Sequence, residues 1–176
     1  MPQDTGEQAR DRVAREANSL RASLPLDPTG TSIAASALTS DVLNRLATLG
    51  GGHLGGVLLI VTPRLMSGVQ PLDEAPGRDD QMIVIALRRV AQSIRKGDLV
   101  CRVSGNELMC ILPGTGPLEA RSVGRRLAGD VAGNEFWHAD TQMTIACEMG
   151  LASRASGAGG YEVAAMIESA RRTILK

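Results

Sequence analysis

The first stretch with a clear hydrophobic pattern is residues 7–24, where apolar positions recur at helical spacing between charged ones. This pattern predicts an amphipathic helix that ends at Pro25, because proline cannot continue a helix. The apolar stripe is narrow, so it could pair with a second copy of itself or with an upstream domain. It consists of Ala9, Val13, Ala17, Leu20 and Leu24.

Downstream, extended and helical patterns alternate. Val57–Thr62 is a continuous apolar run too short for a helix, which predicts a buried strand that stops at Pro63. The turn residues 104–106 separate two extended runs, Leu99–Val103 and Glu107–Leu112, as in a β-hairpin. Turn signals predict a loop over 66–78, and a further strand is expected over Thr141–Ala152. Helices are expected over 32–48, 117–131 and 161–175. One more helix is expected to begin at an N-cap formed by Asp79 or Asp80 and to end at about Lys96.

The alternation of helices and strands with one hairpin predicts the fold class. We expect an α/β (α+β) three-layer sandwich, in which a central mixed sheet carries helices on both faces. The 176 residues fit one such domain. We divide them into an N-terminal linker or signalling helix over 1–26 and the domain over 27–176.

The charge and the aromatic content of the chain argue against nucleic-acid binding. The 19 basic and 19 acidic residues give a net charge of zero, and only 2% of the residues are aromatic. The chain therefore has neither an overall basic field nor base-stacking platforms for nucleic acid. The basic residues are 17 Arg and 2 Lys. This reflects either a GC-rich genome or guanidinium groups that bind phosphate or a purine edge.

Other signals exclude simple alternatives. No signal peptide is evident, and the longest apolar run is far shorter than the roughly 20 residues of a membrane helix, so we expect a soluble cytoplasmic protein without membrane insertion. The three cysteines lack C-x-x-C spacing and are expected to be buried free thiols. Gly50–Gly55 matches G-x-G-x-x-G but precedes a strand, the wrong context for a dinucleotide fingerprint. His53 and His138 are expected in loops, with no metal role.

The segment from Arg95 to Leu108 is the most informative part of the chain. It contains Arg95-x-x-Asp98 followed by Ser104-Gly105-Asn106-Glu107-Leu108. This order resembles the GGDEF (diguanylate cyclase) domain family, whose hairpin signature is R-x-G-G-[D/E]-E-F. The resemblance covers residues 27–176 and includes weaker matches in the family order. These are Asp27-Pro28-Thr29-Gly30, the strand Val57–Met66, Ile111-Leu112-Pro113 with Thr115 and Ala120, and Met149-Gly150-Leu151-Ala152.

The departures from the family pattern concern the catalytic site. Active members hold two divalent ions through carboxylates, and the resemblance places Val61 and Asn106 at two such positions, with Pro63 at the next family Asp. Hard divalent ions prefer charged oxygen ligands. The resemblance therefore implies no catalytic residue, no metal site, no Mg²⁺ and no cofactor. Ser104 replaces the first signature glycine, and Glu107 is retained. Asp80 matches a guanine-contacting Asp of the family, but it serves equally well as a helix N-cap.

The retained residues imply a binding site instead. Arg95-x-x-Asp98 corresponds to the family's inhibitory site for cyclic di-GMP, and Arg126 aligns with a further arginine on the next helix. Arginine can donate to a guanine edge or a phosphate, and aspartate can accept from guanine N–H groups. The alternative is an ordinary surface ion pair between Arg95 and Asp98. Arg102 is expected to be structural. In the family the ligand can bridge two domains, and Arg45 is the candidate for the partner's arginine.

The function implied is a catalytically inactive GGDEF-like domain that acts as a cyclic di-GMP receptor or effector in bacterial second-messenger signalling. We expect cyclic di-GMP as partner, a homodimer formed through the N-terminal helix or through the ligand, and an unknown downstream protein. Two alternatives stay open. One is a ligand-free protein-interaction module, and the other is a non-catalytic sensor that binds GTP through Asp80.

Overall fold

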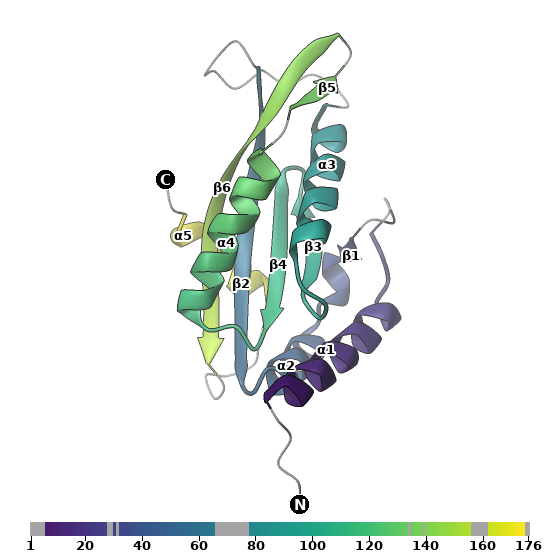
Figure 1. Ribbon diagram of the computed structural model, residues 1–176, viewed down its shortest axis with the longest axis vertical. Helices are drawn as coiled ribbons and strands as arrows, with labels where there is room; N and C mark the ends of the chain where they lie inside the picture. The colour runs from purple at the N-terminus through teal and green to yellow at the C-terminus, as the bar shows by residue number, and fades with distance from the viewer. Residues whose placement is uncertain are drawn as a thin grey trace, which may run out of the picture.

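The fold is known from a computed structural model, which describes residues 6–27, 30, 32–65, 78–133, 135–138, 140–155 and 162–174. Within these residues a six-stranded sheet has the order β1-β3-β4-β2-β6-β5 (Figure 1). The strands are β1 (Ile33–Ala34), β2 (His53–Leu65), β3 (Leu99–Ser104), β4 (Glu107–Pro113), β5 (Phe136–His138) and β6 (Thr141–Ala155). The helices are α1 (Gly6–Ser23), η1 (Ala35–Ala37), α2 (Ser40–Leu49), α3 (Arg78–Ser93), α4 (Pro117–Ala132) and α5 (Val163–Arg172).

The sheet separates two hydrophobic clusters. One cluster joins α3 and α4 to one face of the sheet, with Met82 and Leu127 among its fully buried members. The other joins α1, α2 and α5 to the opposite face, with Leu46 and Ala170 at its centre. The β1–β3 pair is parallel and the remaining pairs are antiparallel. The three-layer sandwich around a mixed sheet is therefore confirmed.

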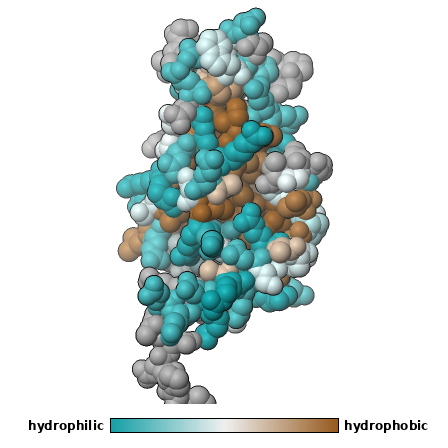
Figure 2. Space-filling view, turned by 45° about the vertical axis from the view of Figure 1, so that its right-hand side comes forward, coloured by the Kyte–Doolittle hydropathy of each residue, from teal (hydrophilic) through white to brown (hydrophobic). Residues whose placement is uncertain are grey.

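The molecular surface is mainly polar, as expected when the apolar side chains are buried between the layers. Figure 2 shows hydrophilic residues over most of one face and apolar residues gathered toward its middle. Among the described residues, the large apolar side chains that are mostly exposed are Leu26, Leu118 and Trp137. None of the helices in the described part of the chain is long and apolar enough to cross a membrane.

The N-terminal helix is packed against its own domain. Ala17 and Leu20 are buried in the cluster beneath α2, and Leu24 packs against it. Ala17, Leu20 and Leu24 of the apolar stripe are therefore covered by the chain's own domain, while pairing of α1 with a second copy stays a prediction. Most residues on the other sides of α1 are exposed. The division of the chain at residue 26 stays a prediction.

Two sequence expectations about individual elements were wrong. Residues 33–39 do not belong to an α-helix, because Ile33 and Ala34 pair with β3, Ala35–Ala37 forms the short helix η1, and α2 begins only at Ser40. The strand β2 continues past Pro63, which pairs with Ile145 of β6. Proline is tolerated there because β4 pairs with β2 only as far as Ile60, so no ladder partner needs its missing N–H.

Smaller differences concern the histidines and one loop. His53 begins β2 and His138 ends β5, so neither lies in a loop, and β5 itself was not expected. His138 Nδ1 is 2.6 Å from Oε1 of Gln81. The loop expected over 66–78 lies outside the described residues except for Arg78, which begins α3. The three cysteines are free thiols; Cys101 and Cys110 are buried, and Cys147 is partly buried.

Candidate functional site

A cavity of about 350 Å³ lies where α3, the start of β3 and α4 meet. Arg95, Asp98 and Arg126 all line it, although they are distributed over 32 positions of the chain. The structure therefore brings together the three residues that the sequence indicated. The other lining residues are Ser93, Ile94, Leu112, Thr115, Glu119, Ser122 and Val123.

Arg95 is fixed by three partners and still faces solvent. Its Nε donates to Asp98 Oδ1 at 3.0 Å, and its Nη2 donates to the Pro113 carbonyl at 2.6 Å and to Thr115 Oγ1 at 2.9 Å. These bonds connect the end of α3 with the loop after β4. The side chain is nevertheless 59% exposed, so a guanidinium group with a defined orientation is presented at the cavity wall.

Asp98 differs from its partner in burial. Its side chain is only 5% exposed, and its Oδ2 also accepts the Arg95 backbone N–H at 3.2 Å. Burial raises the pKa of Asp98 above the usual range for aspartate, while Arg95 and Arg126 act against this rise. A simple surface ion pair does not describe this contact, because one of the two charges is removed from solvent.

Arg126 completes the cationic side of the cavity. Its Nη1 donates to the Ser93 carbonyl at 2.6 Å, which ties α4 to the last residue of α3. It also lies 4.0 Å from Asp130, one helical turn further along α4. Two guanidinium groups and a buried carboxylate on one wall can bind a ligand that carries both negative charge and N–H donors.

The local sequence explains why Arg95 and Asp98 meet. The chain leaves α3 at Ser93 and turns back, with the Asp98 amide donating to the Arg95 carbonyl at 3.1 Å. Gly97 has a φ of +97° in this turn, a conformation that side-chain-bearing residues rarely adopt. The glycine therefore allows the tight reversal that places Asp98 beneath Arg95.

The signature hairpin, residues 104–108, contains a second polar cluster. Here the Glu107 carboxylate accepts hydrogen bonds from two other side chains. Glu107 receives hydrogen bonds from Arg171 Nε at 3.1 Å and Nη2 at 2.7 Å, and from Ser104 Oγ at 2.8 Å. The hydrogen bond from Arg171 is the main cause of a lowered pKa for Glu107. Arg171 comes from α5 and is separated by 64 positions, so no local pattern could have identified it.

The positions at which the resemblance implied metal ligands carry apolar or neutral side chains. The Val61 side chain is fully buried in the core cluster, and its amide donates to the Asn106 carbonyl at 2.9 Å. Pro63 is also buried. Within the residues that the structure describes, no group of three or more His, Cys, Asp or Glu side chains could hold a metal ion.

Asp80 does not cap a helix. It lies inside the first turn of α3, and its Oδ1 accepts from Arg102 Nη2 at 3.0 Å. Arg102 also donates to the carbonyls of Ser104 and Gly105, so it stabilises the hairpin turn, as expected for a structural residue. The N-cap interpretation of Asp80 was wrong.

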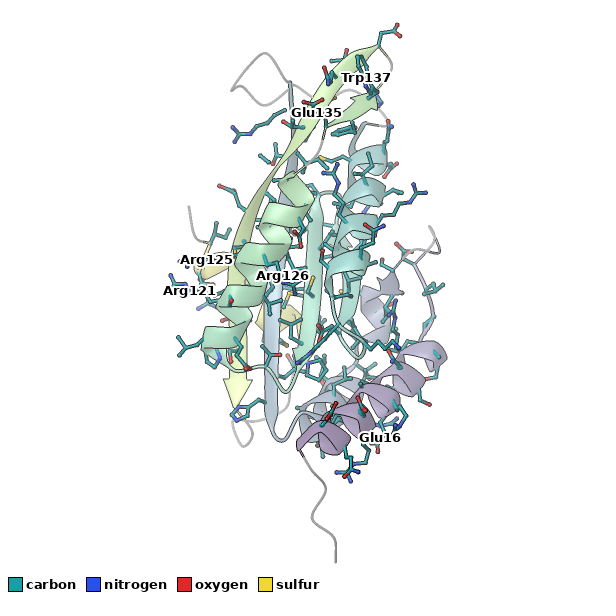
Figure 3. All side chains as sticks on the ribbon, viewed as in Figure 1. Glu16, Arg121, Arg125, Arg126, Glu135 and Trp137 are labelled. Carbon is teal, nitrogen blue, oxygen red and sulfur yellow. The ribbon has the colours of Figure 1, made fainter. Side chains whose placement is uncertain are left out.

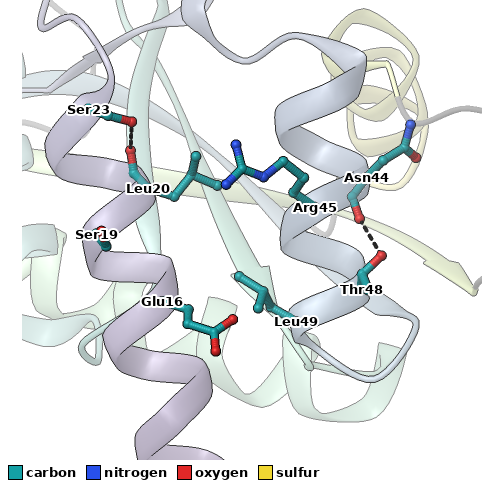
Figure 4. A pocket seen from close by; sticks show the side chains of 8 residues that line it. All are labelled: Glu16, Ser19, Leu20, Ser23, Asn44, Arg45, Thr48 and Leu49. Atoms are coloured by element: carbon teal, nitrogen blue, oxygen red, sulfur yellow. Dashed lines mark hydrogen bonds between the residues drawn. The ribbon is translucent and has the colours of Figure 1, made fainter.

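Arg45 lies away from this cavity. It extends from α2 into a separate groove of about 540 Å³ between α1 and α2 (Figure 4). Since α2 and α4 cover opposite faces of the sheet, Arg45 does not meet Arg126 within one chain. The other residues that line the groove are Glu16, Ser19, Leu20, Ser23, Asn44, Thr48 and Leu49.

The fold and the hairpin define a domain of the GGDEF type, and comparison with known proteins agrees. The family model described as "Diguanylate cyclase, GGDEF domain" matches residues 77–176. The chain therefore belongs to the GGDEF domain family. It is 26% identical over 119 residues to the response regulator PleD of Caulobacter vibrioides, a match that covers 65% of this chain and 25% of PleD. The chain thus spans about a quarter of the length of this curated relative.

Solved GGDEF domains share the fold. The FimX GGDEF domain of Pseudomonas aeruginosa superposes with a TM-score of 0.64 at 13% identity, covering 84% of this chain and 89% of that one. The GGDEF domain of DgcB from Caulobacter crescentus, solved in complex with c-di-GMP, gives a TM-score of 0.58 at 17% identity, covering 80% of each chain. At these identities the likeness establishes the fold alone.

Proposed function

We propose that this chain is a catalytically inactive GGDEF domain that binds cyclic di-GMP in the cavity formed by Arg95, Asp98 and Arg126. The observation that carries the proposal is the convergence of these three side chains on one cavity of about 350 Å³. Guanidinium groups can donate to the phosphates or to guanine O6 and N7, and the carboxylate can accept from guanine N1–H and N2–H₂. Binding would make the domain a receptor in second-messenger signalling.

Two features support the proposed lack of cyclase activity. Val61 and Asn106 supply no carboxylate for a divalent ion, and the loss of one charge-stabilising group commonly slows a reaction by about 10²–10³-fold. The remaining signature carboxylate, Glu107, is already bound by Arg171 and Ser104. We expect no cyclic di-GMP to form when the protein is incubated with GTP and Mg²⁺ or Mn²⁺. Chromatography of the mixture checks this, and any product would overturn the claim of inactivity.

Isothermal titration calorimetry tests the binding site directly. The key variant is Arg126→Ala, with Arg125→Ala as its matched control. The two arginines are neighbours on α4, but Arg125 does not line the cavity and projects from the other flank of the helix (Figure 3). Removal of a charged hydrogen-bonding group costs about 1.5–3 kcal/mol, so Arg126→Ala should weaken binding by roughly ten- to a hundredfold. Arg125→Ala should bind like the wild type.

The same titration separates the alternative functions. Absence of cyclic di-GMP binding by the wild type at tens of micromolar would reject the receptor role and favour a ligand-free interaction module. Equal losses for Arg126→Ala and Arg125→Ala would point to a different site. Binding of GTP without turnover would favour a GTP sensor, although Arg102 already occupies the Asp80 carboxylate that such a site would use.

A further inference from the structure

The turn that carries Arg95 and Asp98 is contacted from two sides. The cavity lies on one side, and helix α1 lies on the other, against the connection between α3 and β3 (Figure 1). The Gly97 amide of this turn donates to Asn18 Oδ1 of α1 at 3.2 Å. This bond joins residues 79 positions apart and connects α1 to the turn.

Gly97 also packs closely against the backbone of α1. A methyl group at Gly97 would lie 3.3 Å from Ala14 Cα and 3.4 Å from the Ala17 side chain. Small residues therefore face each other on the two elements, and the space between them would hold a methyl group only tightly. A displacement of the turn toward α1 would press on the helix backbone.

The four residues of the turn are connected internally as well. Asp98 receives the backbone N–H and the Nε of Arg95, and its own amide donates to the Arg95 carbonyl. A ligand that contacts Arg95 or Asp98 thus acts on the same closed turn that presents the Gly97 amide to Asn18. We propose that occupancy of the cavity controls how firmly α1 is docked, through the hydrogen bond between Gly97 and Asn18.

This inference rests on the proposed function, because it assigns an output to the cyclic di-GMP cavity. Coupling of this kind is reciprocal: if the ligand stabilises the docked helix, the docked helix must increase the affinity for the ligand. Asn18 is then a positioning residue, which acts on the ligand only through the turn. Loss of the hydrogen bond between Gly97 and Asn18 should change the affinity by roughly three- to tenfold, the usual contribution of one neutral hydrogen bond.

The docked helix also forms one wall of the groove that contains Arg45. Glu16, Ser19 and Leu20 of α1 face α2 across this groove (Figure 4). A change in the docking of α1 would therefore alter a surface on the opposite face of the sheet from α4. This gives the ligand a physical route from its cavity to a second surface of the molecule.

Hydrogen exchange of the full chain tests the coupling without any substitution. Saturation with cyclic di-GMP should slow the exchange of backbone amides in residues 14–20 of α1, beyond any slowing in α5, which packs against β6. Affinity measurements then test the reciprocal effect. Asn18→Leu removes the acceptor at similar size, Asn18→Asp retains it, and Ser19→Ala changes the neighbouring exposed residue.

The expected results distinguish this inference from the proposed function. Asn18→Leu should bind cyclic di-GMP roughly three- to tenfold more weakly, while Asn18→Asp and Ser19→Ala stay close to the wild type. If the wild type does not bind, the proposed function fails. If the wild type binds but α1 exchange is unchanged by the ligand, the coupling alone is rejected. If Asn18→Leu does not fold, the exchange measurement on the wild type decides.

Discussion

Asp98 and Glu107 are both carboxylates bound by an arginine, yet their surroundings shift their pKa values in opposite directions. Asp98 lies beside the cavity, and its burial raises its pKa despite the contact with Arg95. Glu107 lies on the hairpin, and the two-point contact with Arg171 lowers its pKa. Desolvation is the largest effect at the first site, and the hydrogen bond from Arg171 is the largest at the second.

This difference indicates different uses for the two sites. Burial of an ion pair rarely adds net stability, because the lost hydration offsets the attraction between the charges. The buried ion pair of Asp98 is thus weak evidence for a purely stabilising role, and this carboxylate, although it accepts two hydrogen bonds from Arg95, borders the cavity. The Glu107 carboxylate is satisfied within the chain by Arg171 and Ser104, and its contact with Arg171 joins the hairpin to α5.

The largest expected effect is a loss of stability when a substitution displaces α5, the helix that carries the Arg171 partner of the hairpin. In Gly150→Ala the added methyl group would lie 2.0 Å from the Ala170 carbonyl oxygen, so α5 must move relative to β6. Overpacking of this kind costs about 1–3 kcal/mol, which urea denaturation can measure. The affinity for cyclic di-GMP should stay unchanged, because Gly150 and α5 are remote from the cavity lining.

A glycine on α4 provides the control for this substitution. A methyl group at Gly129 would have no neighbour within 4 Å, and the residue lies inside an exposed part of the helix. Gly129→Ala should therefore stabilise the protein, by about 0.5–1 kcal/mol. If both variants lose stability equally, the close packing of β6 against α5 is not the cause. If Gly150→Ala also loses ligand affinity, the two sites are not independent.

Intermediate effects on stability and on ligand affinity are expected from a substitution at Gly97, in the turn that borders the cavity. Its φ of +97° is unfavourable for alanine, which should cost about 1 kcal/mol of stability. The variant Gly97→Ala should also bind cyclic di-GMP more weakly, because Arg95 and Asp98 are held by this turn. Gly105→Ala is the matched control in the hairpin turn, since a methyl group there would have no neighbour within 4 Å. A loss of affinity in the control but not in Gly97→Ala would contradict the assignment of the two sites.

The three proposed ligand-binding residues of the cavity could be predicted from the sequence because the motif that contains two of them is short and local. Arg95, Gly97 and Asp98 lie within four positions, and Arg126 lies on a helix whose start at Pro117 is marked by the proline itself. The hairpin 104–106 was equally evident from turn chemistry and spacing. The contacts between Arg95 and Asp98 and within the hairpin are local, whereas the contact of Arg126 with Ser93 spans 33 positions and depends on the tertiary fold.

The features that the sequence did not reveal depend on distant partners. Arg171 reaches Glu107 across 64 positions, and Ile33 leaves a helical pattern to pair with Cys101 at the sheet edge. The apolar stripe of α1 was correctly placed on a helix, but its partner proved to be the chain's own core. Periodicity identifies which face of an element is apolar, whereas the surface that covers this face is decided by the tertiary fold.

The smallest expected effect is the pH dependence of stability, and it compares the two carboxylates directly. Glu107 has a lowered pKa when folded, so its stabilising contribution is complete above the pKa of unfolded Glu and is lost as the pH falls through its folded value. Asp98 has a raised pKa, so the folded protein keeps a proton that the unfolded chain has released. Its contribution therefore decreases as the pH rises from the unfolded pKa of Asp to its folded value.

Urea denaturation between about pH 3 and pH 6 separates these two contributions. Glu107→Gln removes a contribution that rises with pH, so the stability of this variant should rise less steeply with pH than that of the wild type. Asp98→Asn removes a contribution that falls with pH, so its stability should rise more steeply. Slopes that change in the same direction for Glu107→Gln and Asp98→Asn would show that burial does not dominate at Asp98, because opposite slopes require desolvation to outweigh the attraction of Arg95.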